Sequence, residues 1–281
     1  MNSLSINSYA KVNIGLQVLG KRDDGYYNIH TIFQELKFHD IIQLTEIERG
    51  CELSSTDPTF PLDDSNTCKK AFDIVLSYCS INRGISINVE KNIPPGSGLG
   101  GGSSNGAAVI KGMNEMFDLD LSTNEMERLA ASVGADVPFF IKGKTQLGEG
   151  IGEKLTPVDV EMDHVFLLVI SPISISTSWA YSALKNGLEG SVEKPNFSDL
   201  FRGDTIPFEL FKNDFERIVI PAYPEIGEIK DALINNGARY TSLSGSGSTV
   251  FGMFDEDTAA IAAESVLTSD YRTILTYPVH S

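Results

Sequence analysis

The sequence is poor in cysteine. Only three occur in 281 residues, Cys51, Cys68 and Cys79. They are too few and too scattered for a disulfide framework or a zinc site. Cys68 and Cys79 fall on one apolar stripe of an expected helix, so we expect reduced cysteines packed in the core.

Positive charge is scarce as well. The chain has 22 lysines and arginines against 38 aspartates and glutamates, and its net charge is −16. This argues against a broad nucleic-acid or anionic-membrane surface, because both require clustered positive charge. No segment approaches the apolar length of a membrane span, and the N-terminal residues lack the apolar core of a signal peptide. We expect a cytoplasmic enzyme or binding protein with small-molecule partners, no nucleic acid and no membrane. No pattern indicates its oligomeric state.

Glycine, in contrast, is concentrated in PPGSGLGGGSSN at 94–105. An alternating apolar pattern at 85–90 predicts a half-buried strand before it, and apolar residues at helical spacing follow it. The helix is expected to begin near Ser103, Ser104 or Asn105, which are all favourable N-caps. A strand, a glycine loop and a helix N-terminus form an anion site, since the first N–H groups are free and the helix dipole attracts negative charge. The loop is therefore predicted to bind phosphates; the alternative is a long flexible connection.

Two common phosphate loops do not fit this run. A P-loop requires a lysine at its end, and none follows Gly102. Gly96, Gly98 and Gly101 satisfy the dinucleotide pattern G-x-G-x-x-G, but two prolines separate them from the strand, and no acid ends a second strand. A dinucleotide-dependent oxidoreductase stays as the alternative from another enzyme class, and a non-catalytic nucleotide-binding protein as a further one.

Asp136 is a candidate for proton transfer. It lies in GADVPFF at 134–140, between an apolar strand-like run and a helix whose start is marked by a capping box of Ser122 and Glu125. Such an aspartate either binds nearby backbone N–H groups or takes a proton from a hydroxyl.

Two further segments have a structural and a functional reading. Residues 10–18 alternate, so Lys11 and Asn13 share one face of a strand; alone, this indicates an amphipathic strand with a solvated lysine. SLSGSGSTVFG at 242–252 reads either as a tight hairpin turn between strands or as a second backbone wall for a phosphate.

Together and in this order, the segments resemble the GHMP small-molecule kinases. The resemblance is carried by AKVN at 10–13, DGYY at 24–27, PPGSGLGGGSSN at 94–105, GADVPFF at 134–140, GEGIGEKLTPV at 148–158, IST at 175–177, NDFE at 213–216 and SGSGSTVF at 244–251. Within that superfamily the match is best with the branch that phosphorylates a cytidylated methylerythritol in the non-mevalonate pathway to isoprenoid (terpenoid) precursors. Another GHMP kinase, such as a homoserine or mevalonate kinase, is the neighbouring alternative.

The resemblance implies an α+β fold of two subdomains with a deep cleft between them. These would be an N-terminal ATP-binding domain at 1–156 and a C-terminal domain at 157–281, in which residues 165–170 read as a buried strand. It also implies an enzyme that uses ATP and Mg²⁺ to phosphorylate the 2-hydroxyl of the acceptor. Asp136 would be the general base and Lys11 its charged partner.

The resemblance also assigns the binding residues. ATP would be bound by Pro94, Pro95, Gly96, Ser97, Gly98, Leu99, Gly100, Gly101, Gly102, Ser103 and Ser104. The acceptor would be bound by Asn13, Tyr26, Tyr27, Thr177 and Tyr181. The metal ligands stay unassigned, with Ser103, Ser104 and Glu149 as candidates. Position 27 departs from the family pattern, which usually has a histidine against the cytosine there.

Overall fold

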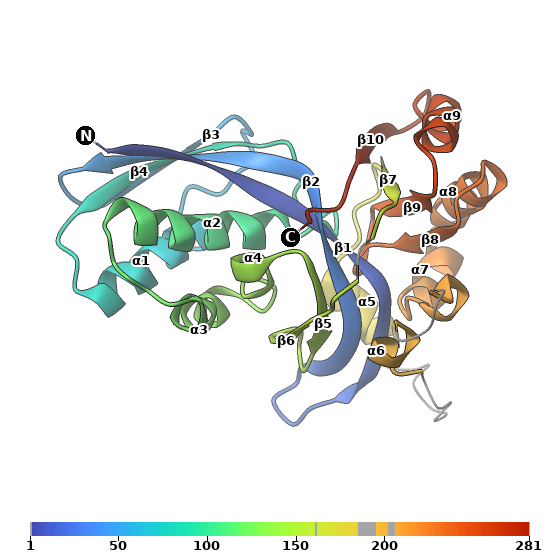
Figure 1. Cartoon of the computed structure of the whole chain (residues 1–281), viewed down its shortest axis with the longest axis horizontal. Helices are drawn as coiled ribbons and strands as arrows, with labels where there is room; N and C mark the ends of the chain where they lie inside the picture. Colours follow the sequence, from blue (N-terminus) through green and yellow to red (C-terminus); the bar gives the residue numbers. More distant parts are fainter. Residues whose placement is uncertain (1, 161, 185–194, 202–205, 281) are drawn as a thin grey trace. The chain divides into compact units, whose positions relative to one another are not determined.

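The computed structural model describes residues 2–160, 162–184, 195–201 and 206–280, and the chain divides into two compact units (Figure 1). Unit 1 consists of Met1–Ala10, Phe38–Pro95 and Gly100–Gly143; unit 2 consists of Lys11–Lys37, Gly96–Leu99 and Lys144–Ser281. The strands β1 (Ser3–Lys21) and β2 (Tyr27–Ile47) each run from one unit into the other. The glycine run likewise contributes its middle to unit 2 and its ends to unit 1. The expected domain boundary at 156/157 stays a prediction.

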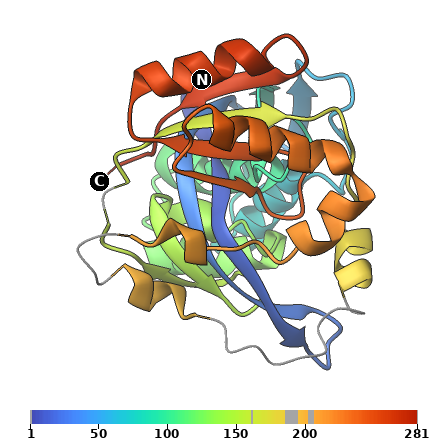
Figure 2. The same ribbon diagram turned by 90° about the vertical axis from the view of Figure 1, so that its right-hand side faces the viewer.

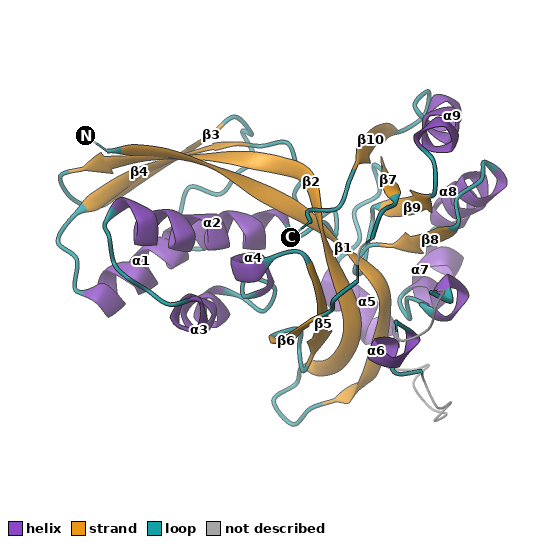
Figure 3. Ribbon diagram, viewed as in Figure 1, coloured by secondary structure: helices purple, strands orange, loops and turns teal. Residues whose placement is uncertain are grey.

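Unit 1 packs helices against a sheet. β4 (Gly84–Glu90) pairs antiparallel with β2 over Ile41–Ile47 and parallel with β3 (Cys51–Ser55). Figure 3 shows the helices α1, α2 and α3 on one side of this sheet. They span Thr67–Cys79, Gly101–Met116 and Thr123–Val133, and the one-turn α4 spans Phe139–Lys142. α2 lies close to the sheet, because a Cβ on its Gly112 would meet the side chains of Leu44 and Ile6 at less than 3.0 Å.

Several sequence expectations for unit 1 are confirmed. The strand expected at 85–90 is β4, whose Ile85, Ile87 and Val89 are fully buried. The capping box is present: the Ser122 hydroxyl accepts from the Glu125 N–H, and the Glu125 carboxylate accepts from the Ser122 N–H at 3.0 Å.

Two expectations for unit 1 are wrong. α2 begins at Gly101 rather than near Ser103, and its N-cap is Gly100, at φ 74° and without a side-chain cap. The glycines themselves turn the chain into the helix, because glycine adopts a positive φ without steric cost. The apolar run after Asp136 is the short helix α4 and not a strand. Pro138 starts it, with φ and ψ already helical at −56° and −36°.

Unit 2 contains a four-stranded antiparallel sheet with the strand order β10-β7-β9-β8. Its strands are β7 (Val165–Ile170), β8 (Tyr240–Leu243), β9 (Val250–Phe254) and β10 (Arg272–Thr276). In Figure 2, α8 (Pro224–Asn235) and α9 (Asp257–Leu267) lie over this sheet. The expected buried strand at 165–170 is confirmed as β7, and residues 165–169 are buried.

The rest of unit 2 surrounds the β1–β2 hairpin. The sharp turn between these strands is closed by the Arg22 N–H, which donates to the Tyr26 carbonyl at 2.7 Å. β5 (Thr145–Glu149) pairs with β2 over Thr31–Gln34, and β6 (Lys154–Pro157) pairs with β5. The described helical segments between β7 and α8 are α5 (Thr177–Leu184), α6 (Phe197–Leu200), η2 (Phe208–Leu210) and α7 (Glu216–Ala222). Leu16, Val18 and Ile29 of the hairpin join Leu167 and Val169 of β7 in one hydrophobic core.

The cysteines are free, as expected. Cys68 is fully buried, whereas Cys51 and Cys79 are partly buried. Burial raises the pKa of the Cys68 thiol to about 12 and that of Cys51 to about 11, so both are unreactive thiols near neutral pH. None of the described helices is both long enough and apolar enough to cross a membrane.

Candidate active site

Lys11 is a buried cation in unit 2. Its side chain is 4% exposed, so the expectation of a solvated lysine on an amphipathic strand is wrong: β1 is buried from Ala10 to Val18 on both faces. The ammonium donates to Asn13 Oδ1 at 2.5 Å and lies 5.4 Å from the centroid of the Phe33 ring. Lysine is rarely buried to this extent, because removing its charge from water is costly.

The two glycine stretches meet in unit 2. The Ser244 hydroxyl donates to the Gly98 carbonyl at 2.8 Å, and the Thr249 N–H donates to the Ser97 carbonyl at 3.1 Å. Gly98 has φ +81°, and a Cβ there would approach the Ser244 carbonyl to well under 3.0 Å. The segment 244–249 is thus both the β8–β9 connection and a second backbone surface beside the first loop.

This second surface also lies against Lys11. A Cβ on Gly245 would be 3.7 Å from Lys11 Nζ and 3.6 Å from Asn13 Oδ1. The Lys11 N–H donates to the Leu99 carbonyl at 2.9 Å. Unit 2 therefore brings together three candidate features of the sequence: Lys11, the middle of the first glycine run and the 244–249 loop.

The NDFE segment holds that loop, a role the sequence did not reveal. Asn213 Nδ2 donates to the carbonyls of Leu243 and Gly245 at 2.7 and 2.8 Å. Glu216 Oε1 accepts from the Leu243 N–H at 2.8 Å. Two side chains of one short segment thus fix the start of the second glycine stretch.

In unit 1 the end of the first glycine run starts α2. Gly101 has no room for a side chain, since a Cβ would meet Ile93 at 2.9 Å, whereas Gly102 is exposed. The carbonyl of Gly102 accepts from the Thr67 hydroxyl at 2.6 Å. Ser104 is buried, and its hydroxyl accepts from Ser8 at 2.7 Å. Ser103 is partly exposed, so of the two serines it is the more accessible to a ligand.

A buried ion pair, missed by the sequence analysis, supports this start of α2. Asp40 is 0% exposed, and its Oδ2 accepts from Lys91 Nζ at 2.5 Å and from Asn105 Nδ2 at 2.8 Å. Its Oδ1 accepts from the N–H groups of Asn92 and Ile93 at 2.7 and 2.8 Å. One carboxylate therefore ties the entry to the glycine run to the first turn of α2. The only signal in the sequence is a lone acid before an apolar strand run.

Asp136 belongs to unit 1. It lies in the turn between α3 and α4 and is partly exposed. The Val137 N–H donates to the Gly134 carbonyl at 3.2 Å, which closes this turn tightly. The predicted pairing of Asp136 with Lys11, which belongs to unit 2, stays a prediction.

The chain is similar to known proteins along nearly its whole length. The model of the GHMP kinases N terminal domain matches residues 66–144, and that of the GHMP kinases C terminal domain matches residues 193–273. A relative from Prosthecochloris aestuarii, named 4-diphosphocytidyl-2-C-methyl-D-erythritol kinase, is 37% identical over 278 residues, covering 97% of this chain and 96% of that protein.

The chain belongs to the GHMP kinases.

Solved structures support the same conclusion. A crystal structure of 4-(cytidine 5'-diphospho)-2C-methyl-D-erythritol kinase has a TM-score of 0.82 at 28% identity and covers 99% of this chain and 100% of that one. A homoserine kinase from Cytophaga hutchinsonii, with a TM-score of 0.79 at 17% identity, covers 100% of this chain and 95% of that one and shares the fold. The predicted α+β GHMP kinase fold is therefore confirmed, and the chain is an ATP-dependent phosphotransferase. The oxidoreductase alternative is excluded.

Tyr27 and Tyr181 of this kinase form a stacked pair. Their ring centroids are 5.1 Å apart with an interplanar angle of 20°. Phe215 meets Tyr181 at 4.9 Å, nearly perpendicular. Two rings this close leave no room for a third ring between them. Tyr26 is 60% exposed, on the turn between β1 and β2.

Thr177 begins α5 and lies beside the second glycine stretch. Its hydroxyl is 3.0 Å from that of Ser246. Asn13 and Thr177, which are both predicted to bind the acceptor substrate, thus lie next to the 244–249 loop. Gly245 of this loop faces Asn13, as described above.

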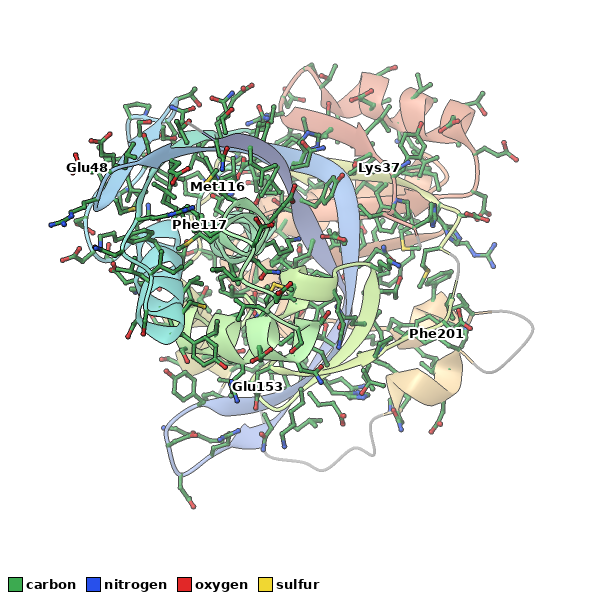
Figure 4. The ribbon with its side chains drawn as sticks, turned by 60° about the vertical axis from the view of Figure 1, so that its left-hand side comes forward. Lys37, Glu48, Met116, Phe117, Glu153 and Phe201 are labelled. Carbon is green, nitrogen blue, oxygen red and sulfur yellow. The ribbon has the colours of Figure 1, made fainter. Side chains whose placement is uncertain are left out.

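The candidate metal ligands do not form a preformed metal-binding site among the described residues. Among the described residues, no group of three or more His, Cys, Asp or Glu side chains is placed to hold a metal ion. Glu153, labelled in Figure 4, accepts from the Ile151 N–H at 2.6 Å and stabilises the β5–β6 turn. Glu149, at the end of β5, is exposed. The pKa of His30 lies below its usual value, because burial lowers it more strongly than the negative charge of Glu149 raises it.

Proposed function

We propose that this GHMP kinase transfers the γ-phosphoryl group of ATP to the 2-hydroxyl of 4-diphosphocytidyl-2-C-methyl-D-erythritol, in the non-mevalonate route to isoprenoid precursors. The observation that carries the proposal is the similarity to relatives of that name along nearly the whole chain, at 37% identity over 97% of it. We also propose a cytoplasmic enzyme that acts on small molecules, without nucleic-acid or membrane partners.

In the proposed reaction, the Asp136 carboxylate accepts the proton of the acceptor 2-hydroxyl. The hydroxyl oxygen forms a bond to the γ-phosphorus, the bond from that phosphorus to the β–γ bridging oxygen breaks, and ADP leaves. Lys11 supports the transfer as a cation that stabilises the ionised partner and the charge that develops on the phosphoryl group. The burial of Lys11 supports this role, because charge interactions are stronger away from water.

The phosphates of ATP are assigned to the backbone of residues 94–104. The free N–H groups at the start of α2 and the glycines that bear no side chain suit a polyanion. In unit 2, the 244–249 loop lies beside Gly98, which supports its reading as a second phosphate wall.

Mg²⁺ is expected to be held mainly by the phosphates. This ion typically keeps several waters and needs only one or two protein ligands in kinases, so the lack of a three-residue cluster in the described chain is compatible with it. The protein ligands stay unassigned: Ser103, Ser104 and Glu149 are candidates, and the Ser104 hydroxyl accepts from Ser8. When bound, the ion supplies neutralisation of phosphate charge.

The cytidine end of the acceptor is assigned to the aromatic pair. A base stacked on the outer face of Tyr27 would replace the contact that the family usually makes with histidine. The exposed Tyr26 is proposed as a second contact, and Asn13 and Thr177 as polar contacts further along the acceptor.

The test is an acceptor panel with ATP and Mg²⁺. ADP formation is measured with 4-diphosphocytidyl-2-C-methyl-D-erythritol, homoserine and mevalonate, and the product is located by ³¹P NMR. We expect turnover with the cytidylated acceptor alone and a new phosphomonoester on its 2-oxygen. Turnover with homoserine or mevalonate instead would reject the proposed acceptor while keeping the family assignment.

A further inference from the structure

Thr31 lies in a buried hydrogen-bonded chain that leads to Lys11. Asn13 Nδ2 donates to Thr31 Oγ1 at 2.9 Å, and Thr31 Oγ1 donates to the Gly15 carbonyl at 2.6 Å. Asn13 Oδ1 in turn accepts from Lys11 Nζ at 2.5 Å. We propose that Thr31 is a positioning residue for the phosphoryl transfer, which acts by fixing the Asn13 amide and, through it, the Lys11 ammonium.

The directions of these bonds follow from the single hydroxyl proton of Thr31. This proton is committed to the Gly15 carbonyl, so the oxygen can only accept from Asn13. The NH₂ group of the amide must then face Thr31, and its oxygen must face Lys11. A rotated amide would place two donors against an ammonium and two acceptors against each other. One threonine hydroxyl thus determines which end of Asn13 meets the lysine.

The last acceptor of this hydrogen-bonded series, Gly15, is also fixed in position. The Gly15 N–H donates to the Tyr240 hydroxyl at 3.0 Å, and that hydroxyl donates to the Phe211 carbonyl at 2.6 Å. Gly15 has φ +68°, and a Cβ there would meet the Phe197 ring at 2.7 Å. The Gly15 carbonyl is therefore an acceptor whose direction is set by its surroundings.

The residues of this hydrogen-bonded series are buried, which makes each hydrogen bond harder to replace. Thr31, Asn13 and Lys11 are 0%, 1% and 4% exposed. Water therefore does not readily replace a lost partner, and removal of the hydroxyl leaves the Asn13 NH₂ group buried and unsatisfied. The amide then gains from rotating or shifting, and its oxygen is no longer held towards the Lys11 ammonium.

The proposal rests on the proposed function, in which Lys11 supports the transfer. Thr31→Val removes the hydroxyl at nearly constant shape, and Thr31→Ser restores it. Thr145→Val is a matched control: Thr145 is 8% exposed on the neighbouring strand β5, and its hydroxyl donates to an amide oxygen, Gln34 Oε1, at 2.7 Å. Because this hydroxyl donates to Gln34, its loss tests the effect of removing a similar buried hydroxyl from another hydrogen bond.

For Thr31→Val we expect kcat to fall about tenfold with the KM for ATP unchanged, as for one lost hydrogen bond to a polar network. Thr31→Ser and Thr145→Val should keep the wild-type kcat. In ¹⁵N-labelled protein, the side-chain NH₂ protons of Asn13 should exchange with solvent much faster in Thr31→Val than in wild type or Thr31→Ser.

The outcomes separate the two proposals. If wild type does not phosphorylate the cytidylated acceptor, the proposed function fails, and the exchange of the Asn13 amide still decides whether Thr31 fixes it. If Thr31→Val keeps the wild-type kcat, or if Thr145→Val loses as much, Thr31 is not a positioning residue. Slow amide exchange in Thr31→Val would overturn the proposal as well.

Discussion

The glycine run is held by different chemistry in the two units. In unit 2, Gly98 is packed against neutral backbone groups and the Ser244 hydroxyl. In unit 1, the start of α2 is tied down by a buried charge, the Asp40 carboxylate, paired with Lys91. One loop thus depends on close backbone approach in one place and on charge compensation in another. The two parts should therefore fail in different ways when they are altered.

The greatest loss of activity should follow a change in unit 1, at the proposed general base. Asp136→Asn removes the proposed proton acceptor and keeps the size of the side chain, so kcat should fall by about 10²–10⁴-fold. The residues proposed to bind ATP are unaltered, so the dissociation constant for ATP should stay near the wild-type value. Steady-state kinetics and calorimetric titration with ATP measure the two quantities. A variant with wild-type kcat would show that Asp136 is not the base.

The next effect should be on the stability of unit 1. Asp40→Ala leaves Lys91 charged and buried without its partner, which costs about 3–5 kcal/mol of unfolding free energy. It also removes the acceptor of two backbone N–H groups at the entry to the glycine run. Chemical denaturation measures the loss. In the double variant Asp40→Ala, Lys91→Met the uncompensated charge is gone, so part of the stability should return; no recovery would mean that the charge is not the cause.

In unit 2, a substitution in the glycine run should reduce stability by steric conflict. Gly98→Ala places a Cβ against the Ser244 carbonyl at a positive φ, and we expect a loss of about 3 kcal/mol and weaker ATP binding. Gly96→Ala is the matched control: its φ is +66°, but a Cβ there meets nothing within 4 Å. It should cost only about 1 kcal/mol, for the backbone conformation alone. Equal losses in the two variants would show that close approach is not what Gly98 provides.

The comparison also shows what the sequence could and could not predict. β4, β7 and the capping box of α3 follow from local patterns, because periodicity and capping involve residues a few positions apart. The motifs at Lys11, Asp136 and the glycine run indicated the family. The Asp40–Lys91–Asn105 cluster and the Thr31–Asn13 bond were missed, since they join residues that only the folded chain brings together. The burial of Lys11 was missed for the same reason: alternation cannot show that a strand is covered on both faces.

The smallest expected effect is the pH dependence that His30 gives to unit 2. Burial lowers the pKa of this imidazole, against a weaker opposite influence of Glu149, and the ring stacks on Phe197 at 5.1 Å. The unfolded chain therefore binds a proton more readily than the folded one. Stability from this group is present above the ordinary histidine pKa of 6.5 and falls as the pH drops through that value towards the lower folded one. His164, whose pKa is also lowered by burial, adds an effect of the same sign. Urea unfolding at pH 7.5 and 5.5 should show a smaller loss on acidification for His30→Gln than for wild type. An equal loss would assign the acid sensitivity to other groups.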